Sequence, residues 1–87
     1  MESEVAEIRQ LLTSVTSSEV VDSIGEDDLF FAERVIDSLR LMEIIDEFEG
    51  RFGIEVDGKD LSPENFGSIA GMARFLRSRR GTSAPPH

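Results

Sequence analysis

The stretch D-S-L-R-L-M-E-I-I-D-E-F-E-G-R-F-G, residues 37–53, decides the fold of this chain. Its larger apolar residues recur at intervals of four, three and four, which predicts one buried face of an α-helix. They are Leu41, Ile45, Phe48 and Phe52. Asp37 is a suitable N-cap, Ser38 opens the helix, and Gly53 is a residue of the kind that ends one. The sequence therefore predicts an amphipathic helix at this place.

The residues before this stretch predict one more long helix and a long connection. Residues 3–15 have helical periodicity, with Ser3 as a plausible N-cap. Their apolar face is Val5, Ile8, Leu12 and Val15. Residues 17–36 predict a loop with one turn of helix around 19–24, held on the core by its apolar side chains. Those side chains are Ile24, Leu29, Phe30, Phe31, Val35 and Ile36.

The residues after it predict a short helix and a last long one. Ser62 followed by Pro63 predicts the start of a helix. Gly67-Ser68 is expected to interrupt that helix after Phe66. Ser68 then caps a helix that we expect Gly81 to end. Its apolar face is Ile69, Met72, Ala73 and Leu76. We predict an all-α fold, a small helical bundle of three main helices plus one short helix, with a domain over 1–81 and a disordered tail over 82–87.

The composition of the chain limits the classes of partner that it can have. The 87 residues hold 18 acids against 9 bases, a net charge of −9, and no cysteine. An acidic surface repels phosphate backbones and attracts basic protein patches, so we expect protein partners and no nucleic acid. No apolar run approaches the roughly 18 residues of a membrane span, so we expect no membrane insertion. A cytoplasmic monomer is the resulting expectation.

Residues for catalysis are missing from the sequence. The one histidine, His87, is the last residue, so a Ser-His-Asp triad has no base. The acidic runs 26–28 and 57–60 lack the oxygen spacing of a calcium loop and are predicted to be solvated loops without a metal. No glycine-rich nucleotide motif occurs. We therefore expect a chain that does not catalyse a reaction.

One residue has a chemically distinctive place. Ser38 would present its hydroxyl at the positive end of a helix dipole, among unpaired N–H groups. A phosphodiester formed on that hydroxyl would be stabilised there. The alternative is that Ser38 only begins a helix, as serines often do.

The wider segment, residues 35–56, resembles the acyl carrier protein family. Members share a D-S-L signature that opens the second helix, a glutamate five positions after the serine (here Glu43), and an F-[GD]-[IV] step into the next loop. The sequence F-G-S-I-A-G-M-A-R-F-L, residues 66–76, is similar to the family's last helix. With the N-terminal helix, the resemblance covers residues 4–77. A three-helix bundle with one short extra helix is the fold that it implies.

The resemblance implies a covalent 4′-phosphopantetheine on Ser38, flanked by Asp37 and Leu39 and transferred from coenzyme A by a phosphopantetheinyl transferase. Its thiol would hold an acyl intermediate, of fatty-acid or polyketide type, as a thioester. An aminoacyl, peptidyl or D-alanyl group is an alternative cargo. A loading ligase and downstream enzymes would carry out the chemistry. An unmodified acidic helical adaptor for basic partners is the remaining alternative.

Some positions depart from the family pattern. Many fatty-acid carriers have glycine where this chain has Ile36, and an acid where it has Arg40. Gly50 and Arg51 stand where a run of glutamates is common. The version here is more similar to discrete carriers of specialised pathways, including aminoacyl and D-alanyl carriers.

The helix over 38–52 is also the expected docking surface. Leu39 and Met42 lie off its apolar face and should be partly exposed. Acids surround them: Glu43, Asp46, Glu47 and Glu49. Acidic groups that steer a basic partner and an apolar patch that holds it suit a transient interface. Arg40 and Arg51 interrupt the acidic surface, so we expect a matching acid on the native partner.

Overall fold

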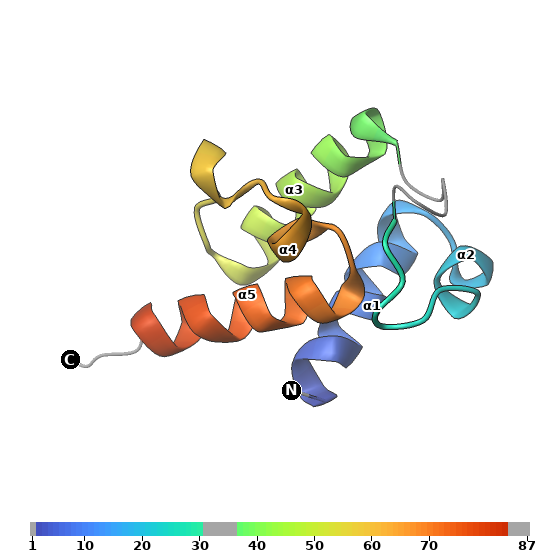
Figure 1. The fold of residues 1–87 in the computed structure, drawn as a ribbon, viewed down its shortest axis with the longest axis horizontal. Helices are drawn as coiled ribbons and strands as arrows, with labels where there is room; N and C mark the ends of the chain where they lie inside the picture. The colour runs from blue at the N-terminus through green and yellow to red at the C-terminus, as the bar shows by residue number, and fades with distance from the viewer. Residues whose placement is uncertain (1, 31–36, 84–87) are drawn as a thin grey trace.

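A computed structural model of the chain describes residues 2–30 and 37–83, and this part is helical with short loops (Figure 1). The elements in chain order are α1 (Glu2–Val15), α2 (Ser18–Asp22), α3 (Ser38–Phe52), the 3-10 turn η1 (Gly58–Asp60), α4 (Pro63–Phe66) and α5 (Ile69–Ser83). Three of these helices are long, and the rest are short. The predicted all-α fold is confirmed.

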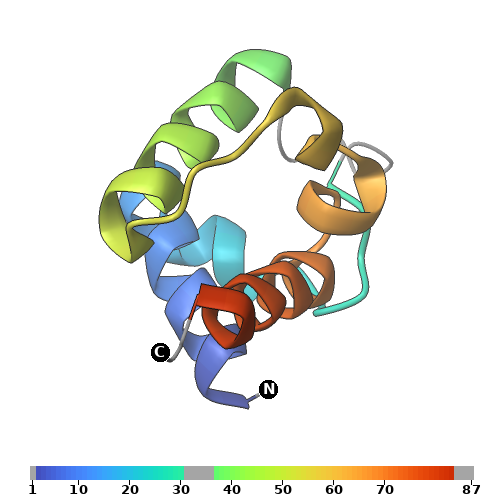
Figure 2. The same ribbon diagram turned by 90° about the vertical axis from the view of Figure 1, so that its left-hand side faces the viewer.

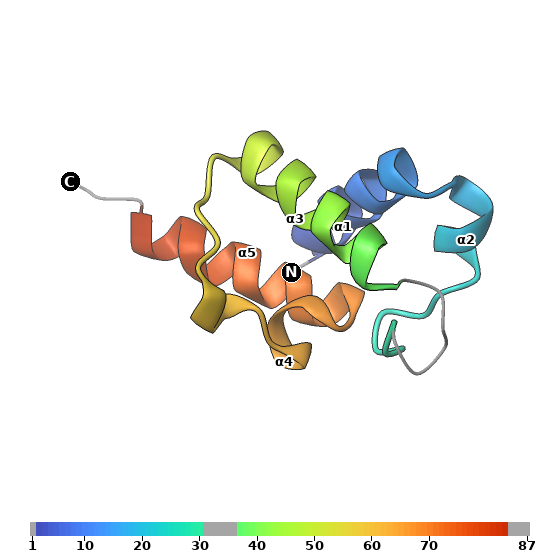
Figure 3. The ribbon, with the colours of Figure 1, turned by 90° about the horizontal axis from the view of Figure 1, so that it is seen from above.

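The three long helices pack around one core. α1 lies against both α3 and α5, while α4 lies on the first turns of α5. Figures 2 and 3 show the segment after α3 crossing the molecule to reach α4. The contact of α4 with α5 is close, because a Cβ atom at Gly71 would overlap the carbonyl oxygen of Glu64. A glycine is therefore required where these two helices meet.

Phenylalanine rings from three helices meet in the core. Phe48 of α3 lies 5.4 Å from Phe66 of α4 and 5.8 Å from Phe75 of α5, centre to centre. Phe66 and Phe75 are 5.3 Å apart. Such distances are typical of favourable aromatic pairs. This cluster joins α3 to α4 and α5.

The predicted apolar faces are confirmed at most of their positions. The predicted residues that are buried are Ile8, Leu12, Ile45, Phe48, Ile69, Met72, Ala73 and Leu76. Val5, Val15, Leu41 and Phe52 are partly buried and pack on the same core. The prediction missed Leu11 and Ile44, which are 0% exposed, and Phe75, which is 7% exposed. The buried arc of each helix is therefore wider than a single stripe of residues, as is usual for globular helices.

Four predicted helix boundaries are confirmed by their hydrogen bonds. The Asp37 side chain accepts from the Arg40 N–H at 2.8 Å. Gly53 ends α3 in the left-handed conformation with φ of 67°, which glycine adopts without strain. The Ser62 hydroxyl accepts from the Asn65 N–H at 3.3 Å, and the Ser68 hydroxyl accepts from the Gly71 N–H at 3.0 Å.

Two predicted helix ends were wrong. α1 begins at Glu2, so Ser3 lies inside the helix and its hydroxyl donates to Glu4 instead of capping. α5 continues through Gly81 to Ser83. A glycine inside a helix costs only about 1 kcal/mol relative to alanine, which does not by itself end a helix. The predicted boundary after residue 81 thus falls within α5.

The loop after α2 differs from the prediction at one residue. Helix α2 lies where a turn of helix was predicted, and Ile24 and Phe30 are buried as expected. Leu29 is 52% exposed and was wrongly placed on the core. The predictions for Phe31, Val35 and Ile36, and for residues 84–87, lie outside the described residues.

Within 2–30 and 37–83, none of the helices has the length and apolarity needed to cross a bilayer. The cytoplasmic location stays a prediction from the sequence.

Candidate functional site

Ser38 is the first residue of α3, directly after its N-cap, and its side chain is exposed. Asp37 fixes this start in two ways. Its carboxylate accepts from the Arg40 N–H, and its carbonyl accepts from the Leu41 N–H at 2.9 Å. The serine hydroxyl therefore stands at the positive end of a 15-residue helix, accessible to solvent.

The surface next to Ser38 is apolar. Leu39 is 76% exposed and Met42 is 57% exposed, which confirms that both lie off the core-facing side of α3. Exposure of two large apolar side chains within one turn of helix is a common property of interaction sites. The attachment candidate and the apolar part of the expected docking surface are thus adjacent.

The acids of α3 differ in whether they have a partner within the chain. Arg40 forms an ion pair with Glu43 at 2.8 Å, and Arg51 forms one with Glu47 at 3.0 Å. Asp46 is exposed and makes no ion pair or hydrogen bond in the part of the chain that the structure describes. Of Glu43, Asp46 and Glu47, Asp46 is therefore the acid whose negative charge no arginine of α3 offsets.

The same two arginines connect α3 to the end of α1. Arg40 donates to the Val15 carbonyl at 3.1 Å, and Arg51 donates to the Ser14 hydroxyl at 3.4 Å. A cation near the last carbonyls of a helix is favourable. Both arginines were predicted to face a partner, and their contacts with α1 were not predicted. The i,i+3 and i,i+4 spacing of Arg and Glu was a signal for the pairs within α3.

A small apolar cavity lies beside the first turns of α3. Its volume is about 120 Å³, and its lining is Leu41, Leu61, Ser62, Pro63 and Phe66. Leu41 follows Ser38 by three residues, so the two side chains lie on the same side of the helix. The cavity therefore opens within about one helical turn of the candidate attachment residue.

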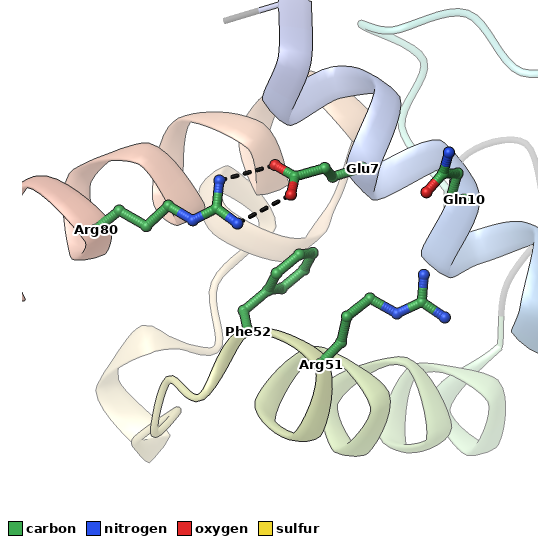
Figure 4. A pocket seen from close by; sticks show the side chains of 5 residues that line it. All are labelled: Glu7, Gln10, Arg51, Phe52 and Arg80. Carbon is green, nitrogen blue, oxygen red and sulfur yellow. Dashed lines mark hydrogen bonds and ion pairs between the residues drawn. The ribbon is translucent and has the colours of Figure 1, made fainter.

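A second, polar hollow lies at the opposite end of α3 (Figure 4). Its lining residues are Glu7, Gln10, Arg51, Phe52 and Arg80. Phe52 follows Ser38 by fourteen positions, which is about 21 Å along the helix axis. We give this hollow no part in the chemistry at Ser38, because it is too far away.

The polar hollow contains an ion pair between α1 and α5. The Arg80 guanidinium donates to both carboxylate oxygens of Glu7, at 2.8 and 2.9 Å (Figure 4). The Arg80 hydrogen bond lowers the pKa of Glu7, and the Glu7 carboxylate raises the pKa of Arg80. This two-point geometry is the stronger kind of surface ion pair. It fixes the last turns of α5 to the first turns of α1.

Comparison with known proteins gives a family for this arrangement. Residues 6–76 match the model of the phosphopantetheine attachment site family. The chain belongs to the phosphopantetheine carrier family. No solved structure matches the chain significantly. As a member, the carrier domain is of the type that holds 4′-phosphopantetheine covalently, and the predicted cofactor is confirmed at that level.

Two curated relatives of the carrier domain are fungal synthases. The chain is 32% identical over 83 residues to the non-reducing polyketide synthase stbA of Stachybotrys bisbyi. It is also 32% identical over 82 residues to the non-reducing polyketide synthase ascC of Acremonium egyptiacum. The alignments cover 95% and 94% of this chain but only 4% of each synthase. The chain thus spans a small fraction of the length of these relatives.

The residues of the carrier domain fit a phosphopantetheine group. An exposed serine at the first position of a long helix is accessible to a transferase. The helix end favours the negative charge of the phosphodiester that would form. An apolar surface and an apolar cavity lie within a turn of it.

Proposed function

We propose that Ser38 holds the 4′-phosphopantetheine arm of this carrier domain, with Asp37 and Leu39 on either side of the attachment point. The observation that carries the proposal is the position of the serine. It is exposed, it opens α3, and it lies in the D-S-L sequence within the family-matched segment. The bound arm supplies a thiol that holds the cargo as a thioester.

The carrier domain's own part is then to bind and present, without catalysing a reaction. Asp37 fixes the first turn of α3, so that the arm leaves the surface at a defined place. The dipole of α3 favours the phosphate next to its N-terminus. Loading by a ligase and processing by downstream enzymes would take place on partner proteins.

For the cargo, we favour an acyl intermediate of polyketide type. The relatives stbA and ascC are polyketide synthases, which supports this choice over a fatty-acid, aminoacyl, peptidyl or D-alanyl group. The cargo is identified by the mass of the domain purified from its native host. A mass increase beyond phosphopantetheine that corresponds to an amino acid would contradict the polyketide assignment.

We place the docking surface for these partners on the exposed side of α3. Leu39 and Met42 would supply the apolar contact. Glu43, Asp46 and Glu47 would supply the acidic groups for partners with basic patches, the transferase among them. Since Arg40 and Arg51 pair with two of these acids, we expect Asp46 to contribute most to the steering of a partner.

The test of the attachment site is the intact mass after incubation with coenzyme A, magnesium and a broad-specificity phosphopantetheinyl transferase. We expect one phosphopantetheine on the wild type and none on Ser38→Ala. Ser18→Ala is the matched control, because Ser18 is also an exposed serine at the first position of a helix. It should be modified like the wild type.

Two results would contradict this assignment. Modification of Ser38→Ala would place the arm on another residue. No modification of the wild type, under conditions that modify a control carrier, would favour the acidic adaptor instead.

A further inference from the structure

Residues 54–61, which we name the strap, connect α3 to the start of α4 and cross the molecule (Figures 2 and 3). The chain enters the strap at Gly53, whose positive φ turns it away from the axis of α3. Ile54 is buried in the core. The Glu49 carboxylate on α3 accepts a hydrogen bond from the Val56 N–H at 2.8 Å. Contacts with the core and with α3 therefore fix the first part of the strap.

Arg79 of α5 is a second anchor. Its guanidinium donates one hydrogen bond to the Asp60 carboxylate at 3.1 Å and another to the Glu55 carbonyl at 3.0 Å. Its Cζ atom also lies 5.3 Å from the centre of the Phe75 ring, a distance at which a cation is attracted to an aromatic face. One side chain thus binds the strap near both of its ends, from a defined position on α5.

Asp60 links Arg79 to α4, because it is hydrogen-bonded to both. It was predicted to lie in a solvated loop, but it is only 9% exposed. Its carboxylate also accepts from the Asp57 N–H at 3.0 Å, and its carbonyl accepts from the Asn65 side chain at 2.9 Å. The Asp57 hydrogen bond and then Arg79 lower the pKa of Asp60, so the carboxyl stays ionised. A poorly solvated carboxylate without its cation is unfavourable, so the geometry of Asp60 depends on Arg79.

The residue after Asp60 forms a wall of the apolar cavity. Leu61 lines it together with Leu41, which is one turn along α3 from Ser38. Leu61 is 46% exposed, so burial contributes little to holding it in place. Its position therefore depends on the backbone of the strap, which Arg79 fixes through Asp60.

We propose that Arg79 is a positioning residue that sets the width of the cavity beside the attachment helix, by holding the strap and with it Leu61. The inference rests on the proposed function in one step only, namely that an apolar group attached through Ser38 would reach this cavity. A consequence is that the size of cargo that fits there is set from α5, by a residue that does not touch the cargo.

The test compares two neighbouring arginines. Arg79→Gln removes the anchor of the strap. Arg80→Gln is the matched control, because Arg80 also pairs with a carboxylate and lies 5.4 Å from the centre of the Phe52 ring. Its ion pair is with Glu7 of α1, whereas that of Arg79 is with Asp60 of the strap, so the two variants should lose comparable stability and differ in their effect on the strap.

The first measurement is amide hydrogen exchange of the strap in the unmodified protein. We expect exchange about tenfold faster in Arg79→Gln and unchanged in Arg80→Gln, because local opening controls exchange in such segments. Equal exchange in the two variants, or no change in Arg79→Gln, would overturn the proposal.

The second measurement is xenon binding, followed by the methyl chemical shifts of Leu41 and Leu61. Xenon and benzene occupy an apolar cavity of about 150 Å³ in a protein interior, so xenon is a suitable probe for one of similar size. We expect about fivefold weaker binding in Arg79→Gln and in Leu61→Ala, and wild-type binding in Arg80→Gln. Unchanged binding in Arg79→Gln would show that the cavity does not depend on the strap, and the proposal would be wrong.

The design remains decisive if a variant is unstable. If Arg79→Gln does not fold, Arg79→Lys keeps the charge next to Asp60 but not the two-pronged geometry, and the same two measurements decide. Both use the protein without its arm. A failure of Ser38 modification would therefore overturn the proposed function and leave these results intact, and the reverse also holds.

Discussion

The two ends of α3 are built differently. At the first turn, Ser38 and Leu39 are exposed. The interactions that hold this turn are the local Asp37 cap and an exposed hydrogen bond from Arg40 to α1. At the last turn, the Phe52 ring lies 5.0 Å from Phe48 and the Arg80 guanidinium lies over it.

The comparison shows where this fold keeps its stability. The end that we assign to the cofactor buries little, so a substitution there can change recognition without unfolding the domain. The opposite end contains aromatic packing and ion pairs between helices. Variants at the two ends should therefore separate stability from carrier activity.

The largest effect is expected from Phe48→Ala. The ring is 0% exposed and contacts rings from α3, α4 and α5, so its loss leaves a cavity in the core. The free energy of unfolding should fall by about 3–5 kcal/mol, which is a large part of the stability of a small domain. Urea denaturation measures it. A curve close to wild type would mean that the aromatic cluster does not hold the fold together.

A smaller loss is expected at the ion pair between Glu7 and Arg80. Because Arg80 lowers the pKa of Glu7 in the folded state, the pair stabilises the fold above the unfolded pKa of about 4.5. This stability is lost as the pH falls from there through the folded pKa. For a pair so exposed to solvent we expect about 0.2–1 kcal/mol.

The difference in thermal stability between wild type and Arg80→Gln, measured from pH 7 to pH 3, tests this. It should shrink as the pH falls. Arg74→Gln, an exposed arginine on the same helix, is the control and should show little difference at any pH. A difference that stays constant with pH would assign the effect of Arg80 to its packing on Phe52.

Ser38→Ala should change stability by about 1 kcal/mol or less, because Asp37 still caps the helix. Carrier activity should disappear completely. Circular dichroism together with intact mass checks both parts. Unfolding of this variant would make Ser38 a structural residue.

The smallest effects are expected from charge reversal on α3. Asp46→Lys should slow the modification of Ser38 several-fold at low salt, because it reverses an exposed acid without a partner in the described chain. Glu43→Lys and Glu47→Lys should also slow it, but less, since Arg40 and Arg51 already neutralise these acids. The differences should shrink as salt rises. Equal rates for all three variants and wild type would place docking elsewhere.

Sequence patterns were sufficient where the interaction is local. The caps at Asp37, Ser62 and Ser68 each involve a residue three positions away, so spacing alone predicts them. The end at Gly53 is likewise local. The position of the candidate site at the start of α3 followed from these short-range rules.

Long-range pairs were not predictable in the same way. Arg79 and Asp60 are 19 residues apart, and Arg80 and Glu7 are 73 apart. No periodicity links such positions, and the last-turn arginines could be explained by the helix dipole alone. The contacts of Arg40 and Arg51 with α1 were missed for the same reason.

The ion pair between Glu7 and Arg80 also bears on where a linker fused to either end of the domain would be attached. It joins the first turns of α1 to the last turns of α5, next to Arg51 and Phe52 (Figure 4). A linker fused near residue 2 or residue 83 would therefore start close to the C-terminal end of α3. Ser38 would then lie at the other end of α3 from that linker, about 21 Å away along the helix axis.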